Sequence, residues 1–451
     1  MSEAKYPKIV VPPPGPKALA AIEKDQKYLP PYNRPFYYPI VVESARDCIV
    51  RDVDGNEYID FNSGLVVCNV GHSHPKLVEA VEKQLRKLIH YSYTDFYYPY
   101  TADLAEKLTE IVPGNFPKKV FFSNSGAESI EAAIKVAKWH TRKPQFIAFI
   151  GAFHGRTMGA ISFTASKPVQ RKYFFPLMPG VTHVPYPYCY RCPFRLEYPD
   201  CGYWCVDFIE EEVLEKFVPP EEVAAVLIET IQGEGGYVVP PPEYHQRLKK
   251  LCEKHGILFI ADEVQSGMGR TGRWFAIEHW GVAPDIVCMA KGIAGGVPLG
   301  ATVARADVMD WEAGAHCTTF GGNPVSCVAA MAVIDIIREE NLLENAQKQG
   351  EYIMKFFNDL KEEVELIGDV RGKGLMIGIE LVKDRETKEP AEKEVKEVIT
   401  RSWKRGVVVI TCGDSTIRIA PPLTITRELV DTALEIISGV LREVDRERKT
   451  Y

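Results

Sequence analysis

From about residue 118 the chain repeats one arrangement of positions: a short apolar run, a turn with glycine, and a helix. Residues 119–123 lead into residues 127–140, in which Ile130, Ile134 and Ala137 fall on one helical face. Further apolar runs follow at residues 145–150, 224–229, 257–261 and 285–289. Strands that are apolar along their whole length are typical of a mostly parallel sheet covered by helices on both faces. The pattern therefore predicts an α/β domain.

The pattern changes after about residue 335. A charged helix is predicted at residues 342–364, and strand-like runs follow at residues 374–382, 406–413 and 415–420. We interpret this part as a smaller α+β domain. The most apolar window, which starts at Val325, is shorter than a membrane span and contains Asp335, so it predicts a buried helix.

Residues 1–35 contain eight prolines, which predict an extended arm and no helix. Such an arm either lies across a partner subunit or is a loose tail. The predicted organisation is an N-terminal arm at 1–35, the first part of a small domain at 36–75, a large domain at 76–335, and the rest of the small domain at 336–451.

Composition narrows the possible functions. The chain has 451 residues, of which 46% are hydrophobic and 25% charged, as in ordinary soluble globular proteins. Its net charge of −7 argues against a nucleic-acid partner, because there is no basic surplus to neutralise phosphates. The first residues are polar and no apolar stretch follows them, so we expect neither a secretory signal nor membrane contact, and a cytoplasmic location.

Two charged residues stand directly after apolar runs, at the strand ends where α/β sheets bind ligands. Lys291 precedes a glycine-rich turn, and desolvation of its stem favours the neutral amine that a Schiff base requires. Asp262, if buried, needs a positive partner. The protonated pyridine nitrogen of pyridoxal phosphate (PLP) is one such partner, and Arg270 or Arg273 is the alternative.

An anion site is predicted at the start of the helix that follows residues 119–123. The turn at Gly126 and the free amides of a helix N-terminus favour a phosphate group. Thr319 adds a possible hydroxyl donor. Phe153 either stacks on a cofactor ring or belongs to the core.

Six motifs stand in a fixed order along the chain: SNSGAE, GAFHGRT, IETIQGEGG, ADEVQSGMGRTG, AKGIAGGVPLG and TTFGGNP. Together they resemble the class III, fold type I PLP aminotransferases, and most of all the 4-aminobutyrate and ornithine aminotransferase group. The resemblance extends over about residues 34–440. It implies a large domain with a mostly parallel sheet, a smaller α+β domain formed by the two chain ends, and a homodimer or dimer of dimers with active sites at the subunit interface.

The resemblance also implies roles for single residues. Lys291 carries PLP as a Schiff base and moves a proton between substrate and cofactor, while Asp262 pairs with the pyridine nitrogen. The other implied cofactor contacts are Ser125, Gly126 and Ala127 at the phosphate with Thr319 of the neighbouring subunit, Phe153 and Val264 on the two faces of the ring, Gln265 at its 3′-oxygen, and His154. Many relatives have tyrosine where Phe153 stands, so stacking is retained and a hydroxyl contact is lost.

The implied substrate contacts indicate an ω-amino donor and 2-oxoglutarate as acceptor. An ω-amine presents only hydrogen at its reacting carbon, so an arginine that binds an α-carboxylate has no partner when this donor is bound. An unpaired, desolvated arginine costs free energy. Arg418 matches that arginine and Glu234 matches the glutamate that pairs with it; the alternative is an ordinary structural ion pair. Arg156 matches the arginine for the far carboxylate, Glu229 is a supporting carboxylate, and Leu65 is a further substrate contact.

Asp95 favours a diamino acid, such as ornithine or lysine, over 4-aminobutyrate. The resemblance implies that its loop lines the substrate entrance of the neighbouring subunit, where Asp95 and Thr94 suit an ammonium group that does not react. In the alternative interpretation Asp95 caps a turn or helix.

Two other functions remain open. Amino-acid racemases in this family share Lys291, Asp262 and the phosphate site, because abstraction of the α-proton is a common first step, but they need no second substrate. Glu234 favours the aminotransferase. A non-catalytic binding protein is the third possibility, and the presence of both Lys291 and Asp262 argues against it.

Four of the eleven cysteines lie in the segment 189–205. CYRCPFRLEYPDCGYWC contains C-x2-C and C-x3-C with eight residues between the pairs, which resembles the spacing of metal ligands. Disulfides and four free thiols are the alternatives. In each case we expect the loop to be structural; the residues are Cys189, Cys192, Cys201 and Cys205.

Overall fold

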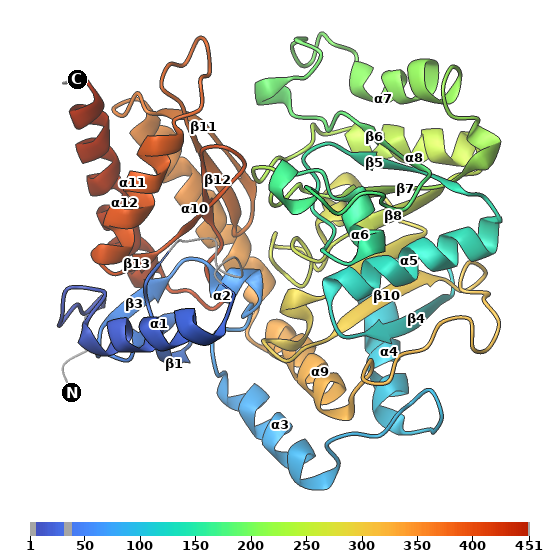
Figure 1. The fold of residues 1–451 in the computed structure, drawn as a ribbon, viewed down its shortest axis with the longest axis horizontal. Coiled ribbons are helices and arrows are strands. Elements are labelled where there is room, and N and C mark those ends of the chain that lie inside the picture. Colours follow the sequence, from blue (N-terminus) through green and yellow to red (C-terminus); the bar gives the residue numbers. More distant parts are fainter. Residues whose placement is uncertain (1–5, 31–37, 450–451) are drawn as a thin grey trace. The chain divides into compact units, whose positions relative to one another are not determined.

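The computed structural model describes residues 6–30 and 38–449 of the chain, which divides into two compact units (Figure 1). One unit is Pro75–Leu343, and the other combines Met1–His74 with Glu344–Tyr451. The sequence places the second boundary at 335/336, inside helix α9 (Pro324–Glu339). The division comes after this helix, because Ile336 and Ile337 are buried and continue its apolar face.

The unit 75–343 is built on a seven-stranded sheet of order β4-β10-β9-β8-β7-β5-β6. Its strands are β4 (Lys118–Ser123), β5 (Gln145–Phe149), β6 (Val181–Val184), β7 (Val223–Glu229), β8 (Leu258–Asp262), β9 (Ile286–Met289) and β10 (Gly300–Arg305). Strand β10 is antiparallel to both of its neighbours, and the other pairs are parallel. The expected α/β fold with a mostly parallel sheet is confirmed, and β6 and β10 are the strands that the apolar pattern does not reveal.

Helices flank this sheet (Figure 1). The helices of this unit are α3 (Pro75–Lys87), α4 (Pro99–Ile111), α5 (Gly126–Thr141), α6 (Met158–Phe163), α7 (Trp204–Phe208), α8 (Tyr244–Lys254) and α9. Helices α4, α5, α6 and α8 pack on the strands, while α3 packs on α9 and α7 on α8. Helix α5 packs against β4, β7, β9 and β10. The predicted face of Ile130, Ile134 and Ala137 is buried in this contact, which confirms the helix inferred from that spacing.

The other unit contains two four-stranded sheets, of order β1-β2-β3-β13 and β11-β12-β15-β14. Its strands are β1 (Val42–Arg46), β2 (Ile49–Asp52), β3 (Glu57–Asp60), β11 (Ile367–Lys373), β12 (Met376–Leu381), β13 (Val407–Val408), β14 (Ile410–Cys412) and β15 (Thr416–Ile419). Its helices are α1 (Pro16–Tyr28), α2 (Ser63–Val66), α10 (Leu342–Lys361), α11 (Glu392–Lys404) and α12 (Arg427–Arg448). Strands expected at 374–382, 406–413 and 415–420 correspond to β12, β13 with β14, and β15.

The proline content predicts an extended N-terminal arm without a helix. That prediction is wrong, because the arm contains helix α1. Its prolines bracket a helix: Pro16 is the first residue of α1, a position where the missing amide hydrogen costs nothing. The Asp54 carboxylate accepts hydrogen bonds from the amides of Lys17 (2.9 Å) and Ala18 (2.8 Å), which stabilises the first turn. This cap comes from a residue more than thirty positions away, so the local composition does not reveal the helix.

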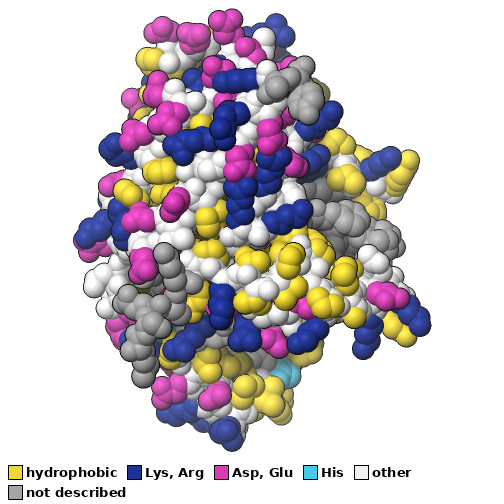
Figure 2. Space-filling model, turned by 90° about the vertical axis from the view of Figure 1, so that its left-hand side faces the viewer, with side chains coloured by type: hydrophobic (Ala, Val, Ile, Leu, Met, Phe, Trp, Pro, Cys, Tyr) yellow, Lys and Arg dark blue, Asp and Glu magenta, His cyan; other side chains and the backbone are white. Residues whose placement is uncertain are grey.

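Acidic and basic side chains are interspersed on the face drawn in Figure 2. Part of this mixing reflects pairs between α11 and α12, in which Arg401 binds Glu447 and Arg405 binds Glu443. Within residues 6–30 and 38–449, no helix combines the length and the apolar character that a membrane crossing requires.

Two helical glycines of the unit formed by the chain ends provide a test of close packing. A Cβ atom at Gly350 in α10 would overlap the backbone of Gly374, whereas one at Gly439 in α12 would meet nothing within 4 Å. Gly350→Ala should therefore lower the melting temperature, with overpacking costing roughly 1–3 kcal/mol. Gly439→Ala should raise it slightly, because alanine is favoured over glycine in helices by about 0.5–1 kcal/mol. Calorimetry on both variants checks this, and equal shifts would contradict the close contact.

Candidate active site

The carboxyl ends of β7, β8 and β9 meet at one edge of the seven-stranded sheet. Glu229, the last residue of β7, is paired in register with Asp262, the last residue of β8, and Asp262 with Cys288 of β9. Lys291 follows β9 by two residues and opens a short 3-10 turn. Its φ of 45° lies in the left-handed region, which is uncommon for a residue with a side chain and marks a constrained position. Three residues singled out in the sequence are thus gathered at one strand edge.

Asp262 is buried and both of its carboxylate oxygens are engaged. Oδ2 lies 2.8 Å from Nδ1 of His154, and Oδ1 accepts the amide of Val264 at 2.9 Å. The amide of His154 donates to Oγ1 of Thr164 at 2.9 Å, which fixes the loop that carries the imidazole. The sequence identifies His154 only as a cofactor contact; the structure shows that it orients the buried carboxylate.

Glu229 joins two loops of the site. Its Oε2 accepts the amide of Phe153 and its Oε1 accepts the amide of Gly233, both at 3.0 Å. Burial, together with the neighbouring Asp262, raises the pKa of this carboxyl to about 7. Glu229 therefore sets the positions of the loops that carry Phe153 and Glu234, a role that its sequence position alone does not reveal.

The N-terminus of α5 lies against these loops. Ser125 is the N-cap residue, and its Oγ accepts the amide of Glu128 at 3.2 Å. A Cβ atom at Gly126 would come within 2.8 Å of Val264 Cγ1, and one at Gly155 would come within 2.7 Å of the Ala127 Cβ. Glycine at these two positions therefore allows the helix terminus to approach both the loop after β8 and the loop after β5.

The remaining predicted cofactor contacts lie in the same unit. Phe153 and Val264 are partly buried, and the Arg156 guanidinium lies 5.5 Å from the centre of the Phe153 ring. The side chain of Gln265 packs so closely on Gly233 that a Cβ atom there would overlap its amide nitrogen. Thr319 is exposed.

The loop that carries Thr319 is tied to the start of α5. Oγ1 of its neighbour Thr318 accepts a hydrogen bond from the Asn124 side chain at 3.4 Å. The same oxygen accepts the amide of Gly321 at 3.1 Å. The loop of Thr319, which is predicted to reach the phosphate of the neighbouring subunit, is therefore anchored to the residues that precede α5 in its own chain.

The predicted substrate contacts are divided between the two units. Leu65 is half exposed and Arg418 is buried on β15, and both belong to the unit formed by the chain ends. The others belong to the unit 75–343: Thr94, Asp95, Arg156, Glu229 and Glu234. Glu234 forms an ion pair with Lys167, with Nζ 2.9 Å from Oε1. No motif in the sequence singles out Lys167.

Asp95 lies in the loop between α3 and α4 and is exposed, as is Thr94. Its amide donates to the carbonyl of Ser92 at 3.3 Å, and Thr94 Oγ1 donates to its carboxylate at 3.2 Å. The side chain thus takes part in a local turn and is also accessible to a cation.

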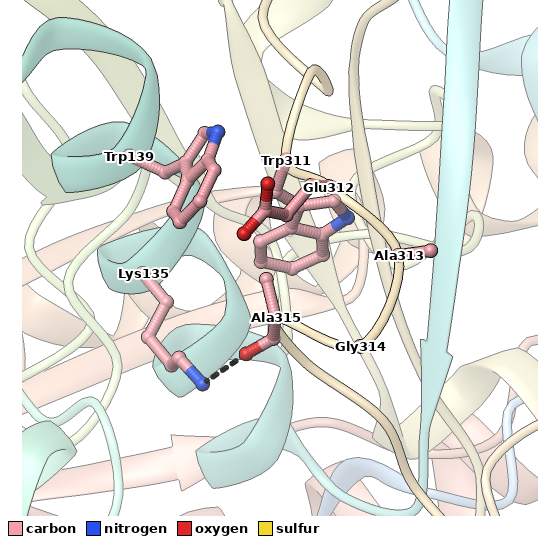
Figure 3. A pocket seen from close by; sticks show the side chains of 7 residues that line it. All are labelled: Lys135, Trp139, Trp311, Glu312, Ala313, Gly314 and Ala315. Carbon is pink, nitrogen blue, oxygen red and sulfur yellow. Dashed lines mark hydrogen bonds between the residues drawn. The ribbon is translucent and has the colours of Figure 1, made fainter.

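A surface cavity of 460 Å³ lies apart from these residues (Figure 3). The indoles of Trp139 on α5 and Trp311 line it, and Lys135 donates to the carbonyl of Ala315 at 3.1 Å. No residue that the sequence predicts for the site lines this cavity, so size alone does not locate the chemistry.

Comparison with known proteins assigns the family. The sequence matches the class-III aminotransferase family over residues 31–441. The chain belongs to the class-III aminotransferases. It is 44% identical to the leucine/methionine racemase of Thermococcus litoralis, over 95% of this chain and 96% of that protein. It is 42% identical to the 4-aminobutyrate aminotransferase GabT of Escherichia coli, over 90% of this chain and 94% of that protein.

A solved structure shows the same fold. The (S)-enantioselective omega-transaminase of Thermomicrobium roseum superposes with a TM-score of 0.87 at 35% identity, covering 95% of this chain and 99% of that one. The family resemblance inferred from the six motifs is confirmed, and so is the fold expected from it.

The residues of this site fit PLP, the cofactor of the class-III aminotransferases. The N-terminus of α5 would present backbone amides to a phosphate group, and the glycines at 126 and 155 let the loops after β8 and β5 pack directly against it. Asp262, held by His154, would face the pyridine nitrogen, and Lys291 would supply the amine. Bound PLP withdraws electrons from the carbon that carries the amino group. Lys291 would then hold or deliver the proton exchanged at that carbon.

Lys291→Ala should abolish measurable turnover while PLP still binds non-covalently, because the phosphate site and Asp262 remain. Turnover assays, with PLP content measured before and after dialysis, check this. Lys348→Ala, which removes an exposed lysine of α10, is the control and should keep full activity. Normal turnover of the Lys291 variant would reject the assignment.

Glu229→Gln tests the protonation of the buried carboxyl. The pKa of Glu229 is raised from 4.5 to about 7, so the folded protein binds this proton more tightly than the unfolded chain does. Its stabilising contribution is therefore full below pH 4.5 and is lost as the pH rises through about 7. Relative to wild type, the melting temperature of the variant should rise from about pH 5 to about pH 8. The control is Glu82→Gln, at an exposed position of α3, whose melting temperature should differ from that of wild type by the same amount at every pH. A difference for Glu229→Gln that does not change with pH would contradict the raised pKa of Glu229.

Proposed function

We propose that this protein transfers the terminal amino group of a diamino or ω-amino acid to 2-oxoglutarate, with ornithine and lysine preferred as donors. The observation that carries the proposal is the partly buried Glu234, which forms an ion pair with Lys167 at 2.9 Å. The two half-reactions of such an enzyme place opposite demands on one arginine. An acceptor brings an α-carboxylate to the reacting carbon, and the ω-amino donor brings none.

A carboxylate that changes its partner solves this problem. When an ω-amine is bound, Glu234 would neutralise Arg418, the arginine that we assign to the α-carboxylate. When 2-oxoglutarate occupies that arginine, Glu234 needs another positive partner, because an unpaired desolvated charge is costly. Lys167 provides one within the same unit as Glu234. Arg156, exposed beside Phe153, would bind the far carboxylate of the acceptor.

Asp95 supports a donor with a second ammonium group. Its carboxylate is exposed and has Thr94 as a neutral hydrogen-bond partner. Ornithine that reacts through its δ-amine has a spare ammonium group for this carboxylate, and 4-aminobutyrate has none. A charge-assisted hydrogen bond in a partly desolvated site contributes about 1.5–3 kcal/mol.

The proposal includes a homodimer or dimer of dimers whose active sites lie at the subunit interface. Exposed apolar side chains support it: Ile89, Phe96 and Tyr97 lie between α3 and α4, and Phe320 lies beside Thr319. The rings of Phe320 and His90 are 5.0 Å apart, so these two segments form one surface region. Apolar surface of this kind marks contacts with another protein.

An amino-acid racemase is the second candidate, favoured by the 44% identity to the Thermococcus litoralis enzyme. Lys291 and Asp262 would serve both reactions, since each begins with removal of a proton from the carbon that carries the amino group. A racemase needs an acid on the opposite face and no second substrate. Glu234 forms an ion pair with Lys167, which favours its ionised form. We therefore assign it a role as a charge partner and do not assign it the role of the second acid that a racemase needs.

Donor kinetics test the proposal. Ornithine and lysine with 2-oxoglutarate should give higher kcat/KM values than 4-aminobutyrate. Asp95→Ala should lower kcat/KM for ornithine by about tenfold to a hundredfold, the equivalent of about 1.5–3 kcal/mol, and leave 4-aminobutyrate unaffected. Asp103→Ala, at an exposed position of α4, is the matched control and should change neither. An equal loss of kcat/KM for ornithine and 4-aminobutyrate would contradict the proposed contact and indicate that Asp95 only stabilises its turn.

A chiral assay separates the second candidate. A single enantiomer of leucine or methionine, incubated without any 2-oxo acid, should remain unchanged over the time in which ornithine transamination is complete. Inversion of that enantiomer without an acceptor would overturn the aminotransferase proposal in favour of the racemase.

A further inference from the structure

The segment 189–205, between β6 and β7, returns on itself. Cys189 begins a 3-10 turn, Cys189–Arg191, and Cys205 lies in the first turn of α7. Gly202 and Tyr203, which follow Cys201, have φ angles of 60° and 67°, in the left-handed region. The rings of Phe194 and Phe208 lie 5.0 Å apart, so the stretches that follow the two cysteine pairs are in contact.

The four cysteines of this segment line one small cavity of 20 Å³. A volume of about 10–15 Å³ holds a single water molecule, so the cavity has room for one small ion. The rest of its lining is proline, leucine and aromatic side chains, including Phe194 and Trp204. No charged side chain lines the cavity among the residues that the structure describes.

None of these four cysteines forms a disulfide in the structure. Four cysteine side chains around one cavity without a charged lining residue provide a sulfur-only donor set, the kind that binds a soft metal ion.

We propose that this cavity is a structural zinc site with four thiolate ligands: Cys189, Cys192, Cys201 and Cys205. Zinc prefers four-coordinate tetrahedral sites, and C-x2-C with C-x3-C supplies two ligands from each of two turns. Binding exchanges four thiol protons for one Zn²⁺, so four protons are released and no oxidant or reductant is needed.

Zinc binding requires a small local rearrangement. In the described part of the chain, no three histidine, cysteine, aspartate or glutamate side chains already stand at metal-binding positions. Zinc–sulfur bonds of about 2.3 Å require the four sulfurs to contract around the ion. The contraction would require the cysteine side chains to rotate, and there is open space beside Gly202, where an added Cβ would meet nothing within 4 Å.

Disulfides fit the arrangement less well. Two disulfides would divide the thiols into pairs, whereas the structure gathers all four around one volume. Bound metal would fix the start of α7, which packs on α8, and α8 packs on β8, the strand that ends at Asp262. The site would thus stabilise the support of the active-site edge without taking part in the reaction.

Metal analysis of the holoenzyme, purified without chelator and dialysed, tests the proposal. We expect about one zinc ion per chain and an X-ray absorption shell of sulfur at about 2.3 Å. Iron bound by the same thiolates would show visible absorption bands beyond those of PLP, and would overturn the choice of metal. A protein without metal, with these thiols either oxidised in pairs or reactive in the native state, would overturn the site itself.

Variants locate the metal. Cys192→Ser with Cys201→Ser should lower the zinc content more than tenfold while PLP content stays unchanged, which shows that the fold persists. Cys412→Ala, which removes a buried thiol of β14, should retain zinc. If the double variant does not fold, a mercurial reagent added to the wild-type holoenzyme should release the zinc as the thiols react. Zinc retained in a folded double variant, or not released by the reagent, would overturn the assignment.

Discussion

The structure of the site depends on two carboxylates buried side by side. Glu229 and Asp262 end adjacent parallel strands in register, where both side chains are shielded from water. Each buried carboxylate needs hydrogen-bond donors or a cation. Asp262 obtains His154 and the amide of Val264, while Glu229 obtains the amides of Phe153 and Gly233 and has a pKa near 7. These hydrogen bonds from Glu229 and Asp262 fix the positions of the loops after β5, β7 and β8.

Close backbone approach is the second constraint. At Gly126 and Gly155 an added Cβ atom would strike Val264 and Ala127, so the start of α5 lies directly against two of the loops that the carboxylates hold. A helix terminus with accessible amides and a buried carboxylate are the two features that suit the phosphate and the ring nitrogen of PLP. A larger residue at either position would therefore have to displace the start of α5 or one of these loops.

The family has aminotransferases and racemases among its members at comparable similarity to this chain. That would follow from the chemistry that we propose, in which both reactions begin with removal of a proton at Lys291 beside Asp262. The choice between them depends on residues outside that common core. In this chain Glu234, in the loop after β7, forms an ion pair with Lys167, and our proposal assigns this pair to the alternate binding of substrates with and without an α-carboxylate.

The sequence alone predicted β4, β5, β7, β8 and β9 and the helices α5 and α9 of the α/β unit, because their apolar positions follow the periods of buried strands and of a buried helix. It also placed Asp262 and Lys291 at strand ends, and the motifs gave the family. Only the tertiary structure decided which groups these residues contact. His154 reaches Asp262 across 108 positions of the chain, Asp54 caps a helix in a proline-rich segment, and Lys167 binds Glu234 although no motif marks it. Each of these contacts joins residues that are distant along the chain, and their pairing depends on how the loops pack, which local pattern and composition do not encode.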